Sequence, residues 1–436
     1  MTYFRSWIDY LAGKKVFRFF AVYVGTGFVN QSIPFLLLPI LTRVLSPSDY
    51  GKLAIFMSLM GVLNIVSYMG TVDAIIRAYF DKNEGESVLS KFVFNSLTIN
   101  LAVCLAMFLF FVSCGRFISS KLSLPLVWFL VLPIIGFSFS IFSIPHKLYQ
   151  MRQQPLLYSV MSISQTLVEI IISILFVIVL KMGWEGRALG ITFSRIIFLF
   201  VGWYLIVKTF RFELKVDFEY VKKILVYGGP VVVHSLGFPL IAAIDRIMVF
   251  KMLGLSVTGL YSAGYSVAAI LGFFVGAFNA AWVPILYDKL GRKSEALKKR
   301  LVRLTYIYFL GITVFALLLS FIAPLFVRFF LGKDFYGSIQ FILWISLGYA
   351  FHGMYTMVVN YIFYEKKTYL LSVTAVVTVF LATFFNFIFI KMNGAIGAAQ
   401  AEFLTFMSRF LFIWFFSNKV FPMPWFSSLR PYKEAA

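Results

Sequence analysis

The chain has 436 residues, of which 61% are hydrophobic and 13% are charged, and its formal net charge is +21. Water-soluble domains are roughly 45–50% apolar and about 25% charged, so this composition excludes a soluble protein. The basic residues lie in short loops between apolar runs and not on one continuous face. This distribution argues against a nucleic-acid partner and fits a membrane topology.

Apolar runs that are long enough to cross a hydrocarbon core of roughly 30 Å recur along the whole sequence. Runs of about ten residues with alternating polarity, which are typical of a transmembrane barrel, do not occur in it. We therefore expect an all-α polytopic membrane protein with about twelve transmembrane helices. The predicted spans cover approximately residues 16–42, 52–76, 90–113, 122–145, 156–180, 187–208, 224–250, 257–286, 303–327, 337–363, 369–390 and 395–418.

Twelve spans place both ends of the chain on the same side of the membrane. Most of the loop Lys and Arg residues fall on that side, above all in the segments 208–223 and 289–303. Because cytoplasmic loops carry the excess of basic residues, both termini are predicted to be cytoplasmic.

The two halves of the sequence resemble each other. Three pairs of segments match in the same order and at nearly the same spacing: RVLSPSDYG (43–51) with KMLGLSVTG (251–259), QMRQQPLLYSV (150–160) with FYEKKTYLLSV (363–373), and KMGWEGRALG (181–190) with KMNGAIGAAQ (391–400). Because six spans separate the copies, the pairs indicate a parallel repeat of six helices. We expect four parts: an N-terminal lobe (1–210), a cytoplasmic linker (211–223), a C-terminal lobe (224–420) and a cytoplasmic tail (421–436).

The first span of each half carries polar residues followed by a helix breaker. Asn30 and Gln31 precede Pro34 in the first span, and His234 precedes Pro239 in the seventh. Interrupted helices in corresponding places of two repeats are typical of a transport site. The alternative is an ordinary proline kink, since proline is common in membrane helices.

Charged residues inside the predicted spans are few, and each costs roughly 2.5–3.5 kcal/mol at the centre of a helix in lipid. Those that lie well inside a span, away from its ends, are Asp73, Glu169, Arg195, Asp245, Arg246, Glu402 and Arg409. We expect them to face protein or a wet cavity. Asp73 and Arg77 are four residues apart on one helix face, so they can pair, either as part of a substrate site or as an anchor of the second span.

Three carboxylates are candidates for proton or ion coupling: Glu169, Glu402 and Asp245, of which Asp245 is considered with its neighbour Arg246 below. Glu169 lies near the middle of the fifth span without an obvious local partner, and the alternative for it is a helix–helix contact. Glu402 and Arg409 lie roughly 10 Å apart along one face, so each needs another partner. Arg195 and Arg409 are expected to be further buried cations.

Asp245 and Arg246 are neighbours, and neighbouring side chains on a helix point about 100° apart. They are therefore expected to have different partners. A guanidinium stays charged, whereas a carboxylate can take up a proton. Arg246 is predicted to be a fixed cation for an anionic substrate, and Asp245 its orienter or an ion-coupling switch. The alternative is that both residues only hold the seventh span to its neighbours.

Several segments carry a family resemblance. They are LPILTRVLSPSDYGKLAIF (38–56), GTVDAIIRAYF (70–80), YGGP (227–230), AIDRIMVFKMLGLSVTGLYSAGYS (243–266) and AAWVPILYDK (280–289). With these segments in this order, the chain resembles the polysaccharide-unit (O-antigen type) flippases of the multidrug/oligosaccharidyl-lipid/polysaccharide exporter superfamily.

The resemblance implies two six-helix lobes in a V around a central cavity. It also implies that the protein moves undecaprenyl-pyrophosphate-linked oligosaccharide from the cytoplasmic to the periplasmic leaflet of the bacterial inner membrane, as an ion-coupled antiporter with alternating access. The lipid-linked oligosaccharide and membrane lipids are the expected partners, a polysaccharide polymerase is a further candidate, and a monomer is expected. Side chains that could bind the sugar hydroxyls are Asn30, Gln31, Asn64, Asn279, Asn360 and Tyr261.

No sequence motif supports catalysis. A phosphate-cradling loop with Gly-Lys-Ser/Thr does not occur in the sequence, so we expect neither an enzyme nor a cofactor or bound metal. The alternative function is a cation-coupled exporter of drugs or other small molecules on the same scaffold. Such an exporter would favour carboxylates over guanidiniums in its cavity.

Overall fold

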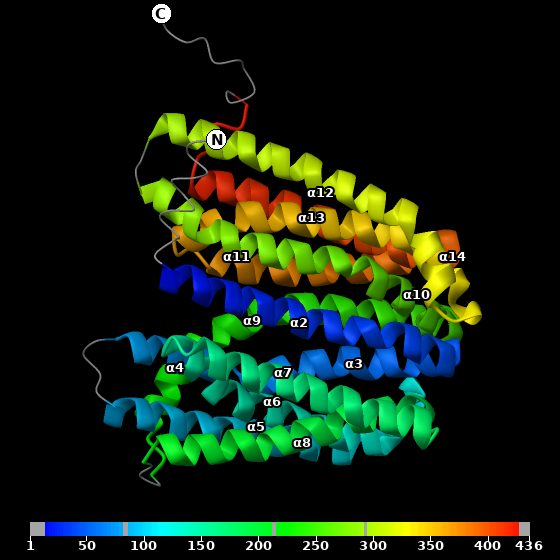
Figure 1. Ribbon diagram of the computed structural model, residues 1–436, viewed down its shortest axis with the longest axis horizontal. Helices are drawn as coiled ribbons and strands as arrows, with labels where there is room; N and C mark the ends of the chain where they lie inside the picture. Colours follow the sequence, from blue (N-terminus) through cyan, green and yellow to red (C-terminus); the bar gives the residue numbers. More distant parts are fainter. Residues whose placement is uncertain (1–13, 82–85, 212–214, 292–293, 427–436) are drawn as a thin grey trace, which may run out of the picture. The chain divides into compact units, whose positions relative to one another are not determined.

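The computed structural model describes residues 14–81, 86–211, 215–291 and 294–426, and every regular element among them is a helix (Figure 1). The α-helices are α2 (Lys14–Val44), α3 (Pro47–Tyr68), α4 (Thr71–Phe80), α5 (Glu86–Leu122), α6 (Leu126–Met151), α7 (Pro155–Ile174), α8 (Gly183–Thr209), α9 (Phe218–Leu253), α10 (Leu255–Ala268), α11 (Ile270–Gly291), α12 (Glu295–Phe330), α13 (Ile339–Tyr364) and α14 (Tyr369–Val420). A π-helical turn, η1 (Leu175–Val179), extends α7, and a 3₁₀ turn, η2 (Lys333–Ser338), precedes α13.

The helices of the described residues confirm the predicted membrane crossings. Eleven helical segments in this part of the chain are long and apolar enough to cross a bilayer. The last of them, α14, is 52 residues long and contains a backbone break at Gly394, where φ is 58° and ψ is −134°. It therefore comprises two helices, which brings the number of crossings to twelve and confirms the all-α class.

The second span differs from its prediction. We expected one helix over 52–76, but α3 ends at Tyr68 and α4 begins only at Thr71. Met69 and Gly70 between them have positive φ angles of 46° and 65°. A side chain at Gly70 is excluded by a close helix contact, because its Cβ would lie 2.4 Å from the Cα of Gly228 on α9. This long-range contact fixes the break.

The expected interruptions of the first and seventh spans are wrong. α2 runs as a continuous helix through the positions of both its prolines, and α9 contains Pro230 and Pro239 within its 36 residues. Proline removes one hydrogen bond from a helix. In a membrane helix, neighbouring groups compensate for that loss, so the helix bends without ending.

By internal packing, the chain divides into two compact units. We call residues 1–45 with 55–239 the N-terminal unit, and residues 46–54 with 240–436 the C-terminal unit. The boundaries fall inside α3 and α9, so each unit contains a short stretch from the other half of the sequence. The predicted lobe boundaries rest on the repeat and not on packing, and they stay a prediction.

The N-terminal unit has an apolar core formed by five of its helices. Fully buried side chains in this core are Val72 on α4, Val93 on α5, Ile141 on α6, Ile206 on α8 and Ile224 on α9. Within this unit α5, α6 and α8 pack side by side, with α7 against α8 (Figure 1). The first part of α9 thus belongs structurally to the N-terminal unit.

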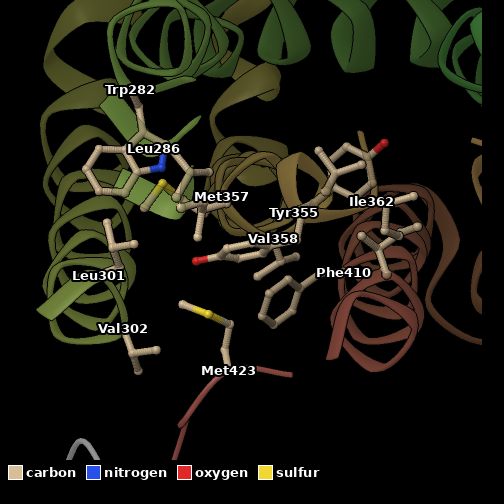
Figure 2. Close-up of a cluster of buried hydrophobic side chains, with 14 of the residues drawn as sticks. Trp282, Leu286, Leu301, Val302, Tyr355, Met357, Val358, Ile362, Phe410 and Met423 are labelled. Carbon is tan, nitrogen blue, oxygen red and sulfur yellow. The ribbon is translucent and has the colours of Figure 1, made fainter. Parts of the chain in front are cut away.

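The C-terminal unit has a second core, which Figure 2 shows in close-up. Trp282 and Leu286 of α11, Leu301 of α12, Val358 of α13 and Phe410 of α14 meet there. Lipid tails are as apolar as these side chains, so close packing and not water exclusion holds such helices together. This packing positions the second half of α14, which carries two of the charged residues described below.

The repeat is visible in the backbone of two turns. Gly183, before α8, has φ 59°, and Gly394, at the break in α14, has φ 58°. Three residues further on, each half has another glycine that lies against the preceding helical segment. A Cβ at Gly186 would lie 2.9 Å from the carbonyl carbon of Phe176, and a Cβ at Gly397 would lie 1.9 Å from the carbonyl oxygen of Phe389. A glycine with positive φ, followed three residues later by a close helix contact, therefore recurs in the two halves, one residue out of step with the sequence match of 181–190 and 391–400.

Candidate functional site

The C-terminal unit holds four charged side chains that are more than nine-tenths buried. Asp245 and Arg246 on α9 are 0% and 8% exposed, and Glu402 and Arg409 on α14 are 1% and 7% exposed. Buried charges are costly unless they are paired or hydrogen-bonded. Their partners therefore decide what this cluster can do.

Asp245 is fastened to α14 by a single amide. The side-chain nitrogen of Asn386 donates to Oδ1 of Asp245 at 2.7 Å, and it also donates to the carbonyl of Ala382 at 2.9 Å. Among the described residues, Oδ2 of Asp245 has no hydrogen-bond partner. One carboxylate oxygen is therefore held in place while the other is available to a proton or a cation.

Arg246 is held by aromatic rings and not by a carboxylate. Its guanidinium carbon lies 4.1 Å from the ring centroid of Tyr265 and 5.8 Å from that of Tyr261, both on α10. One of its nitrogens donates to the carbonyl of Ala242 at 3.0 Å. It makes no ion pair within the described part of the chain. A cation over a ring face keeps its full charge and most of its five N–H donors.

Glu402 is bound to Tyr261, whose hydroxyl donates to Oε2 at 2.8 Å. The other oxygen, Oε1, has no hydrogen-bond partner among the residues that the structure describes. Tyr261 is itself 0% exposed. The tyrosine that we expected to contact a sugar therefore serves Glu402 in this conformation, and its role as a sugar ligand stays a prediction.

Arg409 repeats the arrangement seen at Arg246. Its guanidinium carbon lies 4.3 Å from the ring centroid of Tyr355, and one nitrogen donates to the hydroxyl of that residue at 3.3 Å. Nη1 of Arg409 has no partner in the described residues. The C-terminal unit thus contains two carboxylates with one unpartnered oxygen each and two guanidiniums that lie on tyrosines.

The structure joins some of the predicted site residues and separates others. Asp245 and Arg246 have different partners, as their angular separation predicted. Asn279 on α11 accepts a hydrogen bond of 2.9 Å from Asn360 on α13. Sequence reasoning missed Asn386, although a lone amide inside an apolar span was a usable signal.

In the N-terminal unit, the expectation that Glu169 lacks a local partner is wrong. Nη2 of Arg187 lies 2.6 Å from Oε1 of Glu169, and the two side chains are 4% and 15% exposed. The other terminal nitrogen of Arg187 donates to Ser173 at 2.7 Å. Arg187 stands at the predicted start of the sixth span and was therefore not expected to be buried. Because α7 and α8 form an antiparallel hairpin, the long side chain of Arg187 reaches Glu169 on α7.

Asn30 connects α2 to α7. Its amide nitrogen donates to Ser162, and its amide oxygen accepts a hydrogen bond of 3.1 Å from Thr166. The side chain of Gln31 lies outside the described part of the chain. A role of either residue in sugar binding stays a prediction.

The expected pair between Asp73 and Arg77 does not form among the described residues. Arg77 lies instead over the ring of Tyr227 on α9, with 4.9 Å from the guanidinium carbon to the ring centroid. Asp73 forms a hydrogen bond with Tyr68, the last residue of α3. The break between α3 and α4 explains the difference, since it lets Asp73 reach back to α3.

Arg195, in the middle of α8, also lies over an aromatic ring. Its guanidinium carbon is 5.5 Å from the ring centroid of Phe139 on α6, and its Nε has no hydrogen-bond partner in the described residues. Four guanidiniums are thus held by rings, whereas Arg187 is neutralised by a carboxylate. The four are Arg77, Arg195, Arg246 and Arg409.

Comparison with known proteins identifies the scaffold. The sequence profile of a family described as polysaccharide biosynthesis protein matches residues 16–288, more than half of the chain. The chain belongs to this family. An uncharacterized membrane protein of Haemophilus influenzae is 28% identical over 82% of this chain and 86% of its own. The Lsg locus putative protein 1 of the same organism is 24% identical over 88% and 95%.

Solved structures share the fold at low sequence identity. The lipid II flippase MurJ in an inward closed conformation aligns with a TM-score of 0.71 and 15% identity, over 92% of this chain and 87% of its own. An inward-facing multidrug resistance MATE family transporter of the MOP superfamily aligns with a TM-score of 0.69 and 14% identity, over 89% and 94%. The chain therefore has the fold that a lipid flippase and a multidrug transporter of the MOP superfamily share, and its predicted fold is confirmed.

Proposed function

We propose that the protein is a flippase that moves undecaprenyl-pyrophosphate-linked oligosaccharide from the cytoplasmic to the periplasmic leaflet of a bacterial inner membrane. The observation that carries this proposal is the buried guanidinium of Arg246, which lies on Tyr265 and, among the described residues, has no carboxylate within ion-pair distance. Membership of the polysaccharide biosynthesis protein family and the fold shared with a lipid flippase support it.

A diphosphate group suits such a guanidinium. Its oxygens only accept hydrogen bonds, and the planar fork of arginine binds two of them at once. A buried charge without a partner is unfavourable, and Tyr265 compensates Arg246 only in part. Asp245 and Glu402 act on Arg246 electrostatically without an ion-pair contact among the described residues. A bound diphosphate would make that direct contact, so Arg246 is our candidate ligand for the lipid pyrophosphate.

Coupling to an ion would use the two buried carboxylates of the same unit. Asp245 and Glu402 each retain one oxygen without a hydrogen-bond partner in the described residues. Such an oxygen can take up a proton or contact a cation, and either event changes the charge close to Arg246. Glu169 is the weaker candidate, because its carboxylate is already bound to Arg187.

Candidate side chains for sugar binding are the amides of Asn30 and Asn279. Asn30 and Asn279 are only partly buried, and both have hydrogen-bond partners that a sugar hydroxyl could replace. In the alternative function, the same scaffold would export an organic cation. Guanidiniums without carboxylate partners disfavour that substrate, because like charges repel in a medium of low dielectric constant.

The proposal is tested in liposomes that contain the purified full-length protein. Undecaprenyl-diphosphate-linked oligosaccharide, extracted from the bacterium that encodes the chain, is placed in both leaflets, and the outer pool is oxidised with periodate. Wild-type protein is expected to expose the inner pool much faster than liposomes without protein. Transport of ethidium with no movement of the glycolipid would contradict the proposal and favour the drug-exporter alternative.

A further inference from the structure

In the N-terminal unit, aromatic and cationic side chains form a continuous series of neighbours. We call this series the aromatic track. Its members are Tyr227, Tyr68 and Phe139, with Arg77, Lys147 and Arg195. They come from five helices: α9, α3, α6, α4 and α8.

Contacts between rings, cations and backbone connect the members of the track. Arg77 lies over the ring of Tyr227. Tyr227 and Tyr68 adjoin a close backbone contact, because a Cβ at Gly228 would lie 2.5 Å from the carbonyl oxygen of Met69. The ring centroids of Tyr68 and Phe139 are 6.2 Å apart at an angle of 49°. Arg195 lies over the far end of the series, 5.5 Å from the ring centroid of Phe139. Lys147 on α6 interacts electrostatically with Asp73, the hydrogen-bond partner of Tyr68.

The track runs from the end of the helices into the middle of the membrane. Arg77 lies in the last turn of α4, and Lys147 lies close to the end of α6. Phe139 and Arg195 are near the middle of α6 and α8. Lys147 is eight positions after Phe139, which corresponds to about 12 Å along the helix axis. A ligand in contact with both ends would thus extend over several sugar residues.

None of the six side chains is fully buried, and that of Arg77 is exposed. A charged side chain that is accessible at membrane depth does not face lipid, because that placement is costly. The accessible face of the track therefore borders water or substrate. Packing alone would not explain it, since packed aromatic residues of the same unit, such as Phe129 and Phe56, are about 1% and 0% exposed.

We propose that the aromatic track binds the oligosaccharide part of the substrate, an inference that rests on the proposed function. Sugar rings carry apolar C–H faces that pack on aromatic rings, and their hydroxyls accept hydrogen bonds from guanidinium and ammonium groups. Because stacked rings do not read individual hydroxyl positions, the track would tolerate sugars of different kinds. The lipid pyrophosphate is assigned to Arg246 in the other unit, so the two binding functions reside on different residues.

The test separates sugar binding from pyrophosphate binding by using two probes. Affinities of the full-length protein in nanodiscs are measured for undecaprenyl diphosphate and for the same lipid carrying the oligosaccharide of the source bacterium. Phe139→Leu and Arg195→Gln are expected to weaken binding of the glycolipid about tenfold and to leave undecaprenyl diphosphate unchanged. The matched control is Tyr204→Ala, which removes an exposed ring with Lys208 at 5.9 Å outside the track.

Every outcome bears on one of the two proposals. Wild-type affinity of both track variants for the glycolipid overturns the track, as does an equal loss for both probes. A wild-type protein that binds both probes equally well also overturns it, because the glycan then contributes nothing. Arg246→Ala is expected to weaken binding of both probes. Unchanged binding of both would contradict the assignment of the pyrophosphate to Arg246, and the effects of the track variants could still be interpreted.

Discussion

Replacing Glu169 with glutamine is expected to destabilise the protein without directly affecting transport chemistry. The substitution leaves the guanidinium of Arg187, which is 4% exposed, without the carboxylate that lies 2.6 Å away. Removing one partner of a buried ion pair typically costs about 3–5 kcal/mol. The amide of glutamine retains a hydrogen bond worth about 1 kcal/mol. We therefore expect a loss of about 2–4 kcal/mol in the free energy of unfolding.

The measurement is unfolding of the purified protein in mixed micelles by added SDS, with the double variant as reference. Glu169→Leu combined with Arg187→Met replaces the pair by apolar side chains of similar volume, a change that is often neutral. The double variant is expected to lie within about 1 kcal/mol of wild type and to retain transport. A single Glu169→Gln variant that is as stable as wild type but inactive would refute this reasoning and restore Glu169 as an ion-coupling residue.

Three further predictions concern a close backbone contact, a buried hydrogen bond and the membrane topology. Gly259→Ala is expected to reduce the amount of folded protein, since the added Cβ would lie 1.9 Å from the carbonyl oxygen of Pro47. The control is Gly276→Ala, whose Cβ would have no neighbouring atom within 4 Å and which should match wild type in thermal unfolding. Asn386→Ala is expected to lower the free energy of unfolding by about 1–3 kcal/mol, because it removes the hydrogen bond to Asp245, and unchanged stability would contradict that contact's importance. Reporter fusions at Lys223, Lys293 and Lys366 are expected to be cytoplasmic, and fusions at Ser46, Lys181 and Lys391 are expected to be periplasmic. A fusion found on the opposite side would overturn the predicted topology.

The crossings and the repeat could be predicted because their signals are local. An apolar run of about 20 residues is visible without knowledge of the fold. The repeated turn before α8 and within α14 requires a positive φ, and the chain has Gly183 and Gly394 there. The break after Tyr68 was not predictable in the same way. It depends on the contact between Gly70 and Gly228, which are far apart in the sequence.

Of the candidate site, only the charged residues could be predicted from the sequence. Asp245 and Arg246 stand out because charges are rare in apolar spans. Their partners do not stand out, because 19% of the residues are aromatic and nothing in the sequence distinguishes Tyr265 from other tyrosines. Partner choice follows from helix packing. The same reason explains why Glu169 was assigned no partner, although Arg187 is near in sequence.

The most direct test of the central claim is the transport activity of Arg246 variants in cells. The quantity measured is the fraction of lipid-linked oligosaccharide that reaches the periplasmic leaflet, together with the amount of each variant in the membrane. Arg246→Ala is expected to abolish transport at a normal protein level. Arg246→Lys is expected to retain part of the transport, because the charge remains but the planar fork is lost. The control Arg328→Ala, which changes an exposed arginine on α12, is expected to match wild type. Normal transport by a well-produced Arg246→Ala variant would contradict the account.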